Sequence, residues 1–240
     1  MPEVNTVVFD FIGTLTELDN YPYEGSKEKL YHSLAENGYN SSQAAFFEVY
    51  EKTYQKYRRI RYEHLTEVTN SVWVSEVLNT LGYSTDPNDR IIQTAVTAFF
   101  EDYLAALKLR RSAKSTLKKL RKKYKVGLIS NFTHPPVIYS SLKKLGIEKL
   151  FNEVLVSGAV GWRKPSTRIF VEALRRLDAE AKETIFVGDT PLEDIQGAKG
   201  VGMRTIFIPS QFKNLQDLQQ THTAPDHVIE DLSEILSILD

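Results

Sequence analysis

The chain has 240 residues, of which 42% are hydrophobic and 25% charged, a composition that is typical of a soluble globular protein. Its formal net charge of −1 gives no overall field that would favour nucleic acid or a membrane surface as a partner. The chain contains no cysteine, which excludes disulfide bonds and thiolate metal sites. No apolar run approaches the ~18–20 residues of a membrane helix and no apolar leader precedes the first strand, so a cytoplasmic protein is expected.

Six short apolar runs predict strands, in chain order, at residues 6–10, 125–130, 153–158, 184–189, 204–209 and 227–231. Their nearly continuous hydrophobicity is typical of strands that are buried on both faces. Helical patterns separate them, at about 112–123, 135–146, 166–178 and 192–200. This alternation predicts an α/β core of three layers, in which helices cover both faces of a Rossmann-like parallel sheet.

Residues 19–108 break this rhythm, because no convincing strand is found there. Helical spacing of apolar residues predicts an all-α insert instead, with helices at roughly 25–38, 41–62, 64–82 and 88–108. An aromatic stripe is interpreted as the packing face of this insert and comprises Phe46, Phe47, Tyr50, Tyr54 and Tyr57. The sequence therefore predicts a core domain of residues 1–18 and 109–240, with a helical bundle of residues 19–108 between its two parts.

The segment from Lys108 to Lys125 carries ten Lys or Arg residues. A phosphate-rich partner would be favoured by aromatic residues interleaved with the basic ones, and no such interleaving supports it here. The run is therefore interpreted as a solvated helix face. Neither nucleic acid nor a membrane is expected as a partner, and the sequence does not indicate an oligomeric state.

Four polar clusters directly follow predicted strands. They are Asp10 with Gly13 and Thr14, then Ser130 with Asn131, then Lys164, and last Asp189 with Asp194. Open parallel sheets bind ligands at the carboxyl ends of their strands. A lone strand-end aspartate is usually a helix cap, but four such clusters in this order indicate one site.

Four motifs resemble those of the haloacid dehalogenase superfamily of hydrolases, in the subgroup with a helical cap inserted after the first strand. They are "DFIGTL" (10–15), "SN" (130–131), "RKPSTRIF" (163–170) and "GDTPLEDIQGAKGVGMRTIFI" (188–208). The resemblance implies that Asp10 is a nucleophile that forms a covalent intermediate, which water then cleaves. It further implies a Mg²⁺ ion held by Asp10, by the backbone carbonyl of Ile12 and by Asp189.

The same resemblance assigns roles to the remaining clusters. Lys164 would neutralise the carboxylates and a bound anion, and Asp194 would orient Lys164 or a metal-bound water. Hydrogen bonds to the anion would come from Ser130 and from main-chain N–H groups around Gly13 and Asn131. Thr14 is placed with the substrate-binding residues. The expected substrate is a small phosphorylated metabolite.

Ile12 departs from the family's phosphatase pattern, in which this position is a second Asp that protonates the leaving oxygen and later activates water. Losing a general acid/base typically costs ~10²–10⁴ in rate. One hypothesis is a Mg²⁺-dependent phosphatase that is slow or uses a substitute, for which His134 and Glu17 are candidates. For both side chains a solvated position is the preferred interpretation.

Three alternatives stay open. A 2-haloacid dehalogenase needs no acid for a halide, and Arg58, Arg59 or Arg61 could bind its substrate carboxylate. A phosphonoacetaldehyde hydrolase would use a cap lysine, for which Lys27, Lys29, Lys52 and Lys56 are available. A binding protein without turnover is the third. The carboxylates of "GDTPLED" favour the metal-dependent phosphatase.

Overall fold

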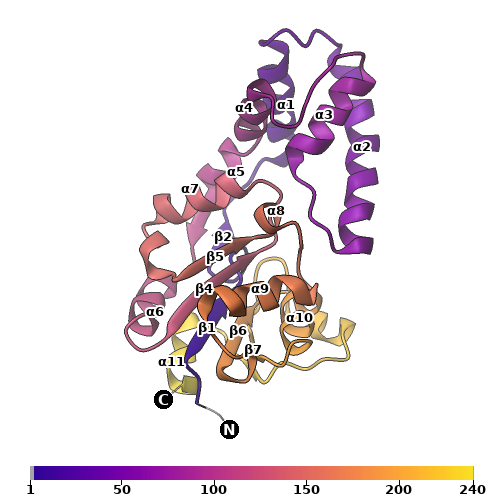
Figure 1. The fold of residues 1–240 in the computed structure, drawn as a ribbon. Coiled ribbons are helices and arrows are strands. Elements are labelled where there is room, and N and C mark those ends of the chain that lie inside the picture. The colour runs from indigo at the N-terminus through magenta and orange to yellow at the C-terminus, as the bar shows by residue number, and fades with distance from the viewer. Residues whose placement is uncertain (1–2, 240) are drawn as a thin grey trace.

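The structure is a computed structural model that describes residues 3–239. Its core is a six-stranded sheet in the order β5-β4-β1-β6-β7-β8, with every neighbouring pair parallel (Figure 1). The strands are β1 (Thr6–Phe9), β4 (Lys125–Ser130), β5 (Glu153–Val156), β6 (Thr184–Gly188), β7 (Arg204–Phe207) and β8 (His227–Val228). All six predicted strands are found. Because β1 lies between β4 and β6, the residues that follow these three strands meet at one edge.

Helices cover both faces of the sheet, which confirms the predicted three-layer α/β fold. Val8 of β1 packs with Phe170 of α9, whereas its neighbours Val7 and Phe9 point to the other face and the larger apolar cluster. One layer holds α9 (Thr167–Leu177) and α10 (Gly197–Lys199), and the other holds α6 (Ala113–Leu120), α7 (Pro135–Leu145) and α11 (Ile235–Leu239). Shorter helical segments are α8 (Ser157–Val160), the π-helical Pro191–Gln196, and 3-10 turns at Glu148–Leu150, Ala181–Glu183, Leu215–Gln220 and Leu232–Glu234.

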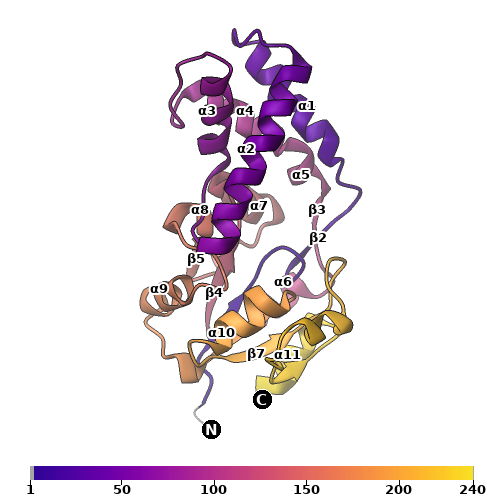
Figure 2. The same cartoon turned by 90° about the vertical axis from the view of Figure 1, so that its right-hand side faces the viewer.

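A helical cap is inserted after the first strand and stands above the carboxyl ends of the strands, far from both termini (Figure 2). Its helices are α1 (Tyr23–Ala35), α2 (Gln43–His64), α3 (Asn70–Thr80), α4 (Arg90–Phe99) and α5 (Glu101–Ala106). The helix α2 begins where Ser42 accepts a hydrogen bond from the backbone N–H of Ala45, at 3.3 Å. The aromatic stripe on α2 packs into the cap as predicted.

The last predicted helix of the cap, 88–108, is wrong in two respects. The helix is interrupted at Phe100, which separates α4 from α5. Residues Leu107–Leu109 form strand β3, which is antiparallel to β2 (Thr16–Leu18). Leu107 is buried and Lys108 is exposed, opposite Glu17, which is the alternation of a strand. The predicted boundaries between core and cap fall close to this two-stranded ribbon and stay a prediction.

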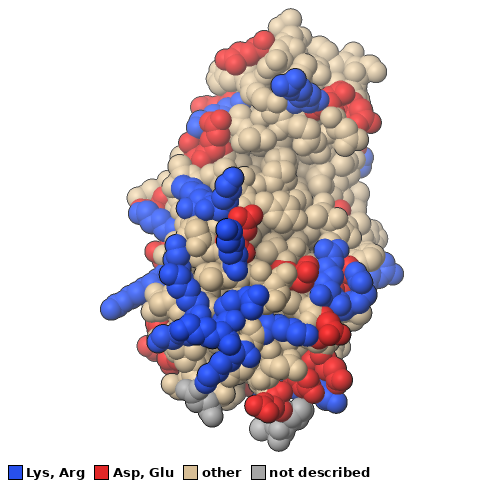
Figure 3. Space-filling model, turned by 60° about the vertical axis from the view of Figure 1, so that its left-hand side comes forward, with Lys and Arg blue, Asp and Glu red and all other residues tan. Residues whose placement is uncertain are grey.

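The basic run is a solvated surface, as predicted. Lys114, Lys118 and Lys119 of α6 are exposed, and Figure 3 shows Lys and Arg side chains gathered over one part of the surface. Arg110 is an exception, because it is half-buried and its guanidinium donates to the carbonyl of Gly13 at 2.8 Å. Among the described residues, no helix combines the length and apolar character needed to cross a membrane.

Candidate active site

Lys164 lies at the centre of the strand-end cluster. Its side chain is only 1% exposed, and its Nζ donates to Asp10 Oδ1 at 2.7 Å and to Asp194 Oδ1 at 2.6 Å. A third bond runs to the carbonyl of Ile129, at 3.1 Å. Burial opposes the charge, but the two carboxylates outweigh it and raise the pKa of Lys164. The ammonium is therefore protonated at neutral pH and compensates two buried carboxylates.

Asp189 directly follows β6, and Asp194 lies in the π-helical segment Pro191–Gln196 just after it. Asp189 accepts hydrogen bonds from the hydroxyls of Ser210, at 2.6 Å, and Thr190, at 3.3 Å. Burial and the nearby charge of Asp10 raise the pKa of Asp189 to about 7. Asp194 accepts from the backbone N–H of Thr190 at 2.9 Å, besides its ion pair with Lys164. Each of the three aspartates has an oxygen within 4.8 Å of the others, an arrangement that can hold a cation.

The glycine of the turn after Asp10 is required by its surroundings. Gly13 has φ +90°, and a Cβ atom there would lie 2.2 Å from Asp189 Oδ2. Any other residue would be strained and would displace that carboxylate. Gly13 therefore serves the close approach of the backbone to Asp189.

Within the described part of the chain, three buried polar atoms of the predicted cluster have no hydrogen-bond partner. They are Asp10 Oδ2, Ser130 Oγ and Thr14 Oγ1. Ser130 ends β4 and Asp10 follows the adjacent β1, so both reach the same edge of the sheet. Unpaired buried polar groups are costly, so these atoms indicate a place for a polar ligand.

Asn131 has its side chain committed to the loop of Lys164. Its Oδ1 accepts from the backbone N–H of Lys164 at 2.8 Å, and its Nδ2 donates to the Lys164 carbonyl at 3.0 Å. The same Nδ2 donates to Glu193 at 2.8 Å. The side chain thus positions the segment that carries Lys164.

The structure therefore brings the predicted cluster residues together, although their roles stay predictions. Ile12 lies beside them, half-buried and packed against the main apolar cluster, and it offers no acid or base. Of the two substitutes, Glu17 is exposed on β2. The interpretation of His134 as solvated is wrong: it is 4% exposed, stacks on Phe100 at 5.6 Å, and burial lowers its pKa to about 4.

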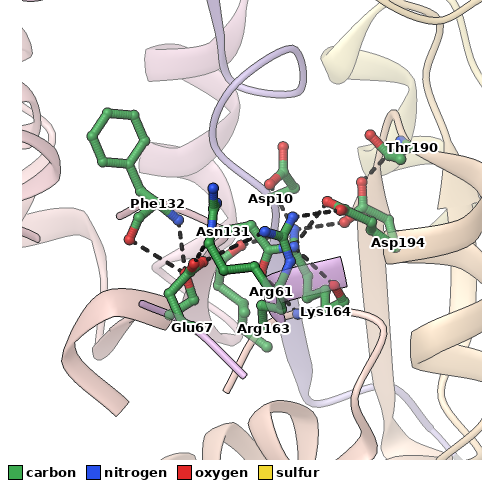
Figure 4. A network of polar contacts seen from close by, with 12 residues as sticks. Asp10, Arg61, Glu67, Asn131, Phe132, Arg163, Lys164, Thr190 and Asp194 are labelled. Atoms are coloured by element: carbon green, nitrogen blue, oxygen red, sulfur yellow. Dashed lines mark hydrogen bonds and ion pairs between the residues drawn. The ribbon is translucent and has the colours of Figure 1, made fainter. Parts of the chain in front are cut away.

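Sequence reasoning missed an ion-pair network that joins the cap to the loop of Lys164 (Figure 4). Glu67, between α2 and α3, pairs with Arg61 of α2 and lies 3.8 Å from Arg163. It also accepts from the hydroxyl of Ser157 at 2.6 Å. Arg163 in turn donates to Glu193 at 2.8 Å. No local pattern marks this network, because its members lie far apart in the chain.

Backbone hydrogen bonds reinforce this connection. The N–H of Glu67 donates to the carbonyl of Gly161 at 2.9 Å, and that of Arg163 donates to the carbonyl of Leu65 at 3.1 Å. The guanidinium of Arg163 also lies 4.2 Å from the centre of the Tyr62 ring. The cap is therefore attached directly to the residue that precedes Lys164.

A cavity of about 230 Å³ lies between the cap and the core. Its lining is mostly aromatic and consists of Tyr21, Tyr23, Tyr50, Tyr54, Arg61, Asn70, Trp73, Phe99, Phe100, Asn131, Phe132 and Thr133. Among the three cap arginines named above, Arg61 lines this cavity, while Arg58 and Arg59 are exposed. None of the four candidate lysines of the cap is among the lining residues.

Comparison with known proteins places the chain among hydrolases. A family model described as haloacid dehalogenase-like hydrolase matches residues 4–202. A glyceraldehyde 3-phosphate phosphatase of Methanopyrus kandleri is 32% identical over 155 residues, which cover 64% of this chain and 66% of that protein. A ribulose-1,5-bisphosphate 5-phosphatase of Halopiger xanaduensis is 28% identical over 97% of this chain and 98% of its own length.

A solved structure is also similar over the whole chain. A 2-haloacid dehalogenase from Pseudomonas syringae pv. Tomato DC3000 has a TM-score of 0.70 and 27% identity, and the match covers 98% of both chains. The motifs, the sheet with its inserted cap and the matching family model agree with one another. The protein therefore belongs to the haloacid dehalogenase-like hydrolase family and is a hydrolase.

Proposed function

We propose that the protein is a Mg²⁺-dependent phosphatase that transfers the phosphoryl group of a small phosphorylated metabolite to Asp10. The carrying observation is the buried group of Asp10, Asp189 and Asp194 around Lys164, in which Asp10 Oδ2 has no partner. The phosphatases among its relatives support the same reaction class.

The two carboxylate oxygens of Asp10 have different surroundings, which suits it to act as the nucleophile. Lys164 holds Oδ1 at 2.7 Å and fixes the plane of the carboxylate, whereas Oδ2 is unpaired. In the proposed step Oδ2 forms a bond to phosphorus while the bond from phosphorus to the alcohol oxygen breaks. The unpaired hydroxyl of Ser130 is available to donate to a phosphoryl oxygen. Water then cleaves the aspartyl phosphate and releases phosphate.

The residues present suit a magnesium ion. Among the described residues Asp189 is held only by two hydroxyls, so it can supply an oxygen ligand. Asp10 can supply Oδ1, which keeps a lone pair beside its bond to Lys164, and this leaves Oδ2 for the attack on phosphorus. Asp194 is already used by Lys164 and the N–H of Thr190, so it would support the site from outside. The backbone carbonyl of Ile12 is the proposed third ligand. Bound Mg²⁺ would neutralise charge on the phosphoryl oxygens.

Ile12 limits how fast this chemistry runs. The leaving oxygen must take its proton from water, and water must attack the intermediate without a base at this position. His134 does not replace it, since burial lowers its pKa to about 4 and its ring stacks on Phe100. We therefore propose slow turnover of poor leaving groups and faster turnover of activated esters.

A 2-haloacid dehalogenase is the second candidate. It is favoured by Ile12, because a halide needs no acid, and by the likeness to the dehalogenase of Pseudomonas syringae. It does not account for Asp189, which is buried beside Asp10 and has no ion-pair partner among the described residues. The phosphatase proposal gives a role to Asp10, as the nucleophile, and to Asp189, as a metal ligand.

The test compares p-nitrophenyl phosphate with L-2-chloropropionate, each with Mg²⁺ and with EDTA, for the wild type and Asp10→Asn. We expect nitrophenol release that requires Mg²⁺ and is lost in the variant. Chloride release that is insensitive to EDTA would overturn the phosphatase proposal in favour of the dehalogenase.

A further inference from the structure

The cavity between cap and core has an unusual wall. Of its twelve lining residues, eight are Tyr, Trp or Phe, although these residues make up 11% of the chain. Tyr50 and Tyr54 lie parallel, with ring centres 6.3 Å apart, and Tyr54 meets Trp73 edge-on at 6.0 Å. Both tyrosines belong to the stripe that the sequence assigned to packing alone. The wall therefore offers aromatic faces and edges to whatever enters.

The cavity adjoins the proposed site of phosphoryl transfer. Asn131 lines it and directly follows Ser130, whose buried hydroxyl is unpaired. The side chain of Asn131 is hydrogen-bonded to both the backbone N–H and the backbone carbonyl of Lys164, and the Lys164 ammonium donates to Asp10. An ester with its phosphate at Asp10 would therefore direct its alcohol part toward the aromatic wall.

The charge of the wall restricts what it can bind. Arg61 is the charged residue of the lining, and its Nε donates to Glu67. Aromatic cages also bind quaternary ammonium groups, but the described residues of this lining include no carboxylate that would attract a cation. A polyol is disfavoured as well, because hydroxyls buried against aromatic rings lose their hydrogen bonds to water.

We infer that the leaving alcohol carries a flat, uncharged or acidic ring, so that the substrate is a phosphate monoester of a ring-bearing alcohol. This inference rests on the proposed phosphatase function and narrows its substrate. An apolar cavity of about 150 Å³ is sufficient for benzene, so about 230 Å³ accommodates one substituted ring. Packing of the ring against Tyr54, which is half-buried, then supplies selectivity that a short polyol phosphate cannot obtain.

The experiment compares benzyl phosphate, cyclohexylmethyl phosphate and glycerol 1-phosphate, with Mg²⁺ and the full chain. All three release a primary alcohol, so differences in kcat/KM report mainly on recognition of the alcohol. We expect benzyl phosphate to exceed glycerol 1-phosphate at least tenfold and cyclohexylmethyl phosphate at least threefold. Tyr54→Leu should lower kcat/KM for benzyl phosphate about fivefold or more and leave glycerol 1-phosphate within twofold.

Tyr57→Leu is the matched control, since Tyr57 lies on the same helix but outside the cavity lining. It should leave the ratio of the substrates unchanged. Binding of benzylphosphonate, which has no ester bond to break, should be tighter than that of propylphosphonate and should weaken in Tyr54→Leu. This measurement does not depend on turnover.

Equal rates for the three esters, unaffected by Tyr54→Leu, would overturn the inference and leave the phosphatase proposal intact. A preference for phosphocholine would likewise overturn it, in favour of a cation cage. Mg²⁺-independent chloride release from L-2-chloropropionate, with no ester hydrolysed, would overturn the proposed function and this inference with it.

Discussion

Glu67 is expected to be the side chain whose neutralisation most weakens the attachment of the cap to the core. Its carboxylate is fully buried, pairs with Arg61 and Arg163, whose side chains are 11% and 3% exposed, and accepts from Ser157. Glu67→Gln keeps the shape but leaves both guanidinium groups without that charge. The variant therefore tests the electrostatic part of the connection.

The loss of stability in Glu67→Gln depends on the contacts that Arg61 and Arg163 keep in the variant. Removing one partner of a buried ion pair costs about 3–5 kcal/mol. Arg163 keeps its bond to Glu193 at 2.8 Å, and Arg61 borders a cavity, so the lower end of the range applies. We expect a loss of about 3 kcal/mol in the free energy of unfolding, and a fall of about 6–12 °C in Tm for a chain of this size.

Denaturant unfolding of the wild type, Glu67→Gln and Glu63→Gln measures this loss. Glu63 is exposed near the end of α2, so its variant should stay within about 0.5 kcal/mol of the wild type. A Glu67→Gln variant as stable as the Glu63→Gln control would refute the reasoning, because the buried charges would then be compensated elsewhere.

Three further changes have expected outcomes. Burial lowers the pKa of His134 to about 4, below its ordinary 6.5. The folded state is therefore fully stable with respect to this group above pH 6.5, and its free energy of unfolding decreases by about 3 kcal/mol as the pH falls toward 4. His134→Phe, which can keep the stacking on Phe100, should therefore reduce the difference between unfolding free energies at pH 7 and pH 4.5. Ile12→Asp should raise kcat for an unactivated ester by about 10²-fold or more, and no gain would show that position 12 does not limit turnover. Lys164→Met leaves Asp10 and Asp194 uncompensated, so it should abolish turnover and lower stability by about 3–5 kcal/mol, measured by steady-state assay and urea unfolding.

The sheet and its strand-end cluster were predictable because they rest on local signals. β1, β4 and β6 are apolar runs that lead into polar residues, and parallel strands gather those ends at one edge. Asp10, Lys164 and Asp194 could thus be grouped from sequence, and the structure places Lys164 2.7 Å and 2.6 Å from the two carboxylates. The end of the last cap helix was mispredicted because Leu107 follows Tyr103 and Leu104 at helical spacing, and a strand of three residues is too short to show its alternation.

The contacts between cap and core could not be predicted, because they depend on how two distant segments meet. Glu67 and Arg163 each look like ordinary charged loop residues in the sequence, and only folding brings them within 3.8 Å. The same holds for Ser210, whose bond to Asp189 joins two strand-end loops. His134 was misjudged for a related reason: the prolines after it indicate a helix start, but Phe100 of the cap buries its ring.

Rapid mixing with p-nitrophenyl phosphate and Mg²⁺, followed by acid quench and peptide mass analysis, tests the central claim most directly. Because Ile12 cannot activate water, the aspartyl phosphate should accumulate. The account predicts a burst of nitrophenol approaching one per site, with one phosphoryl group on the peptide that contains Asp10, and no burst in Asp10→Asn. Mg²⁺-dependent turnover with neither a burst nor a labelled peptide, retained in Asp10→Asn, would contradict it.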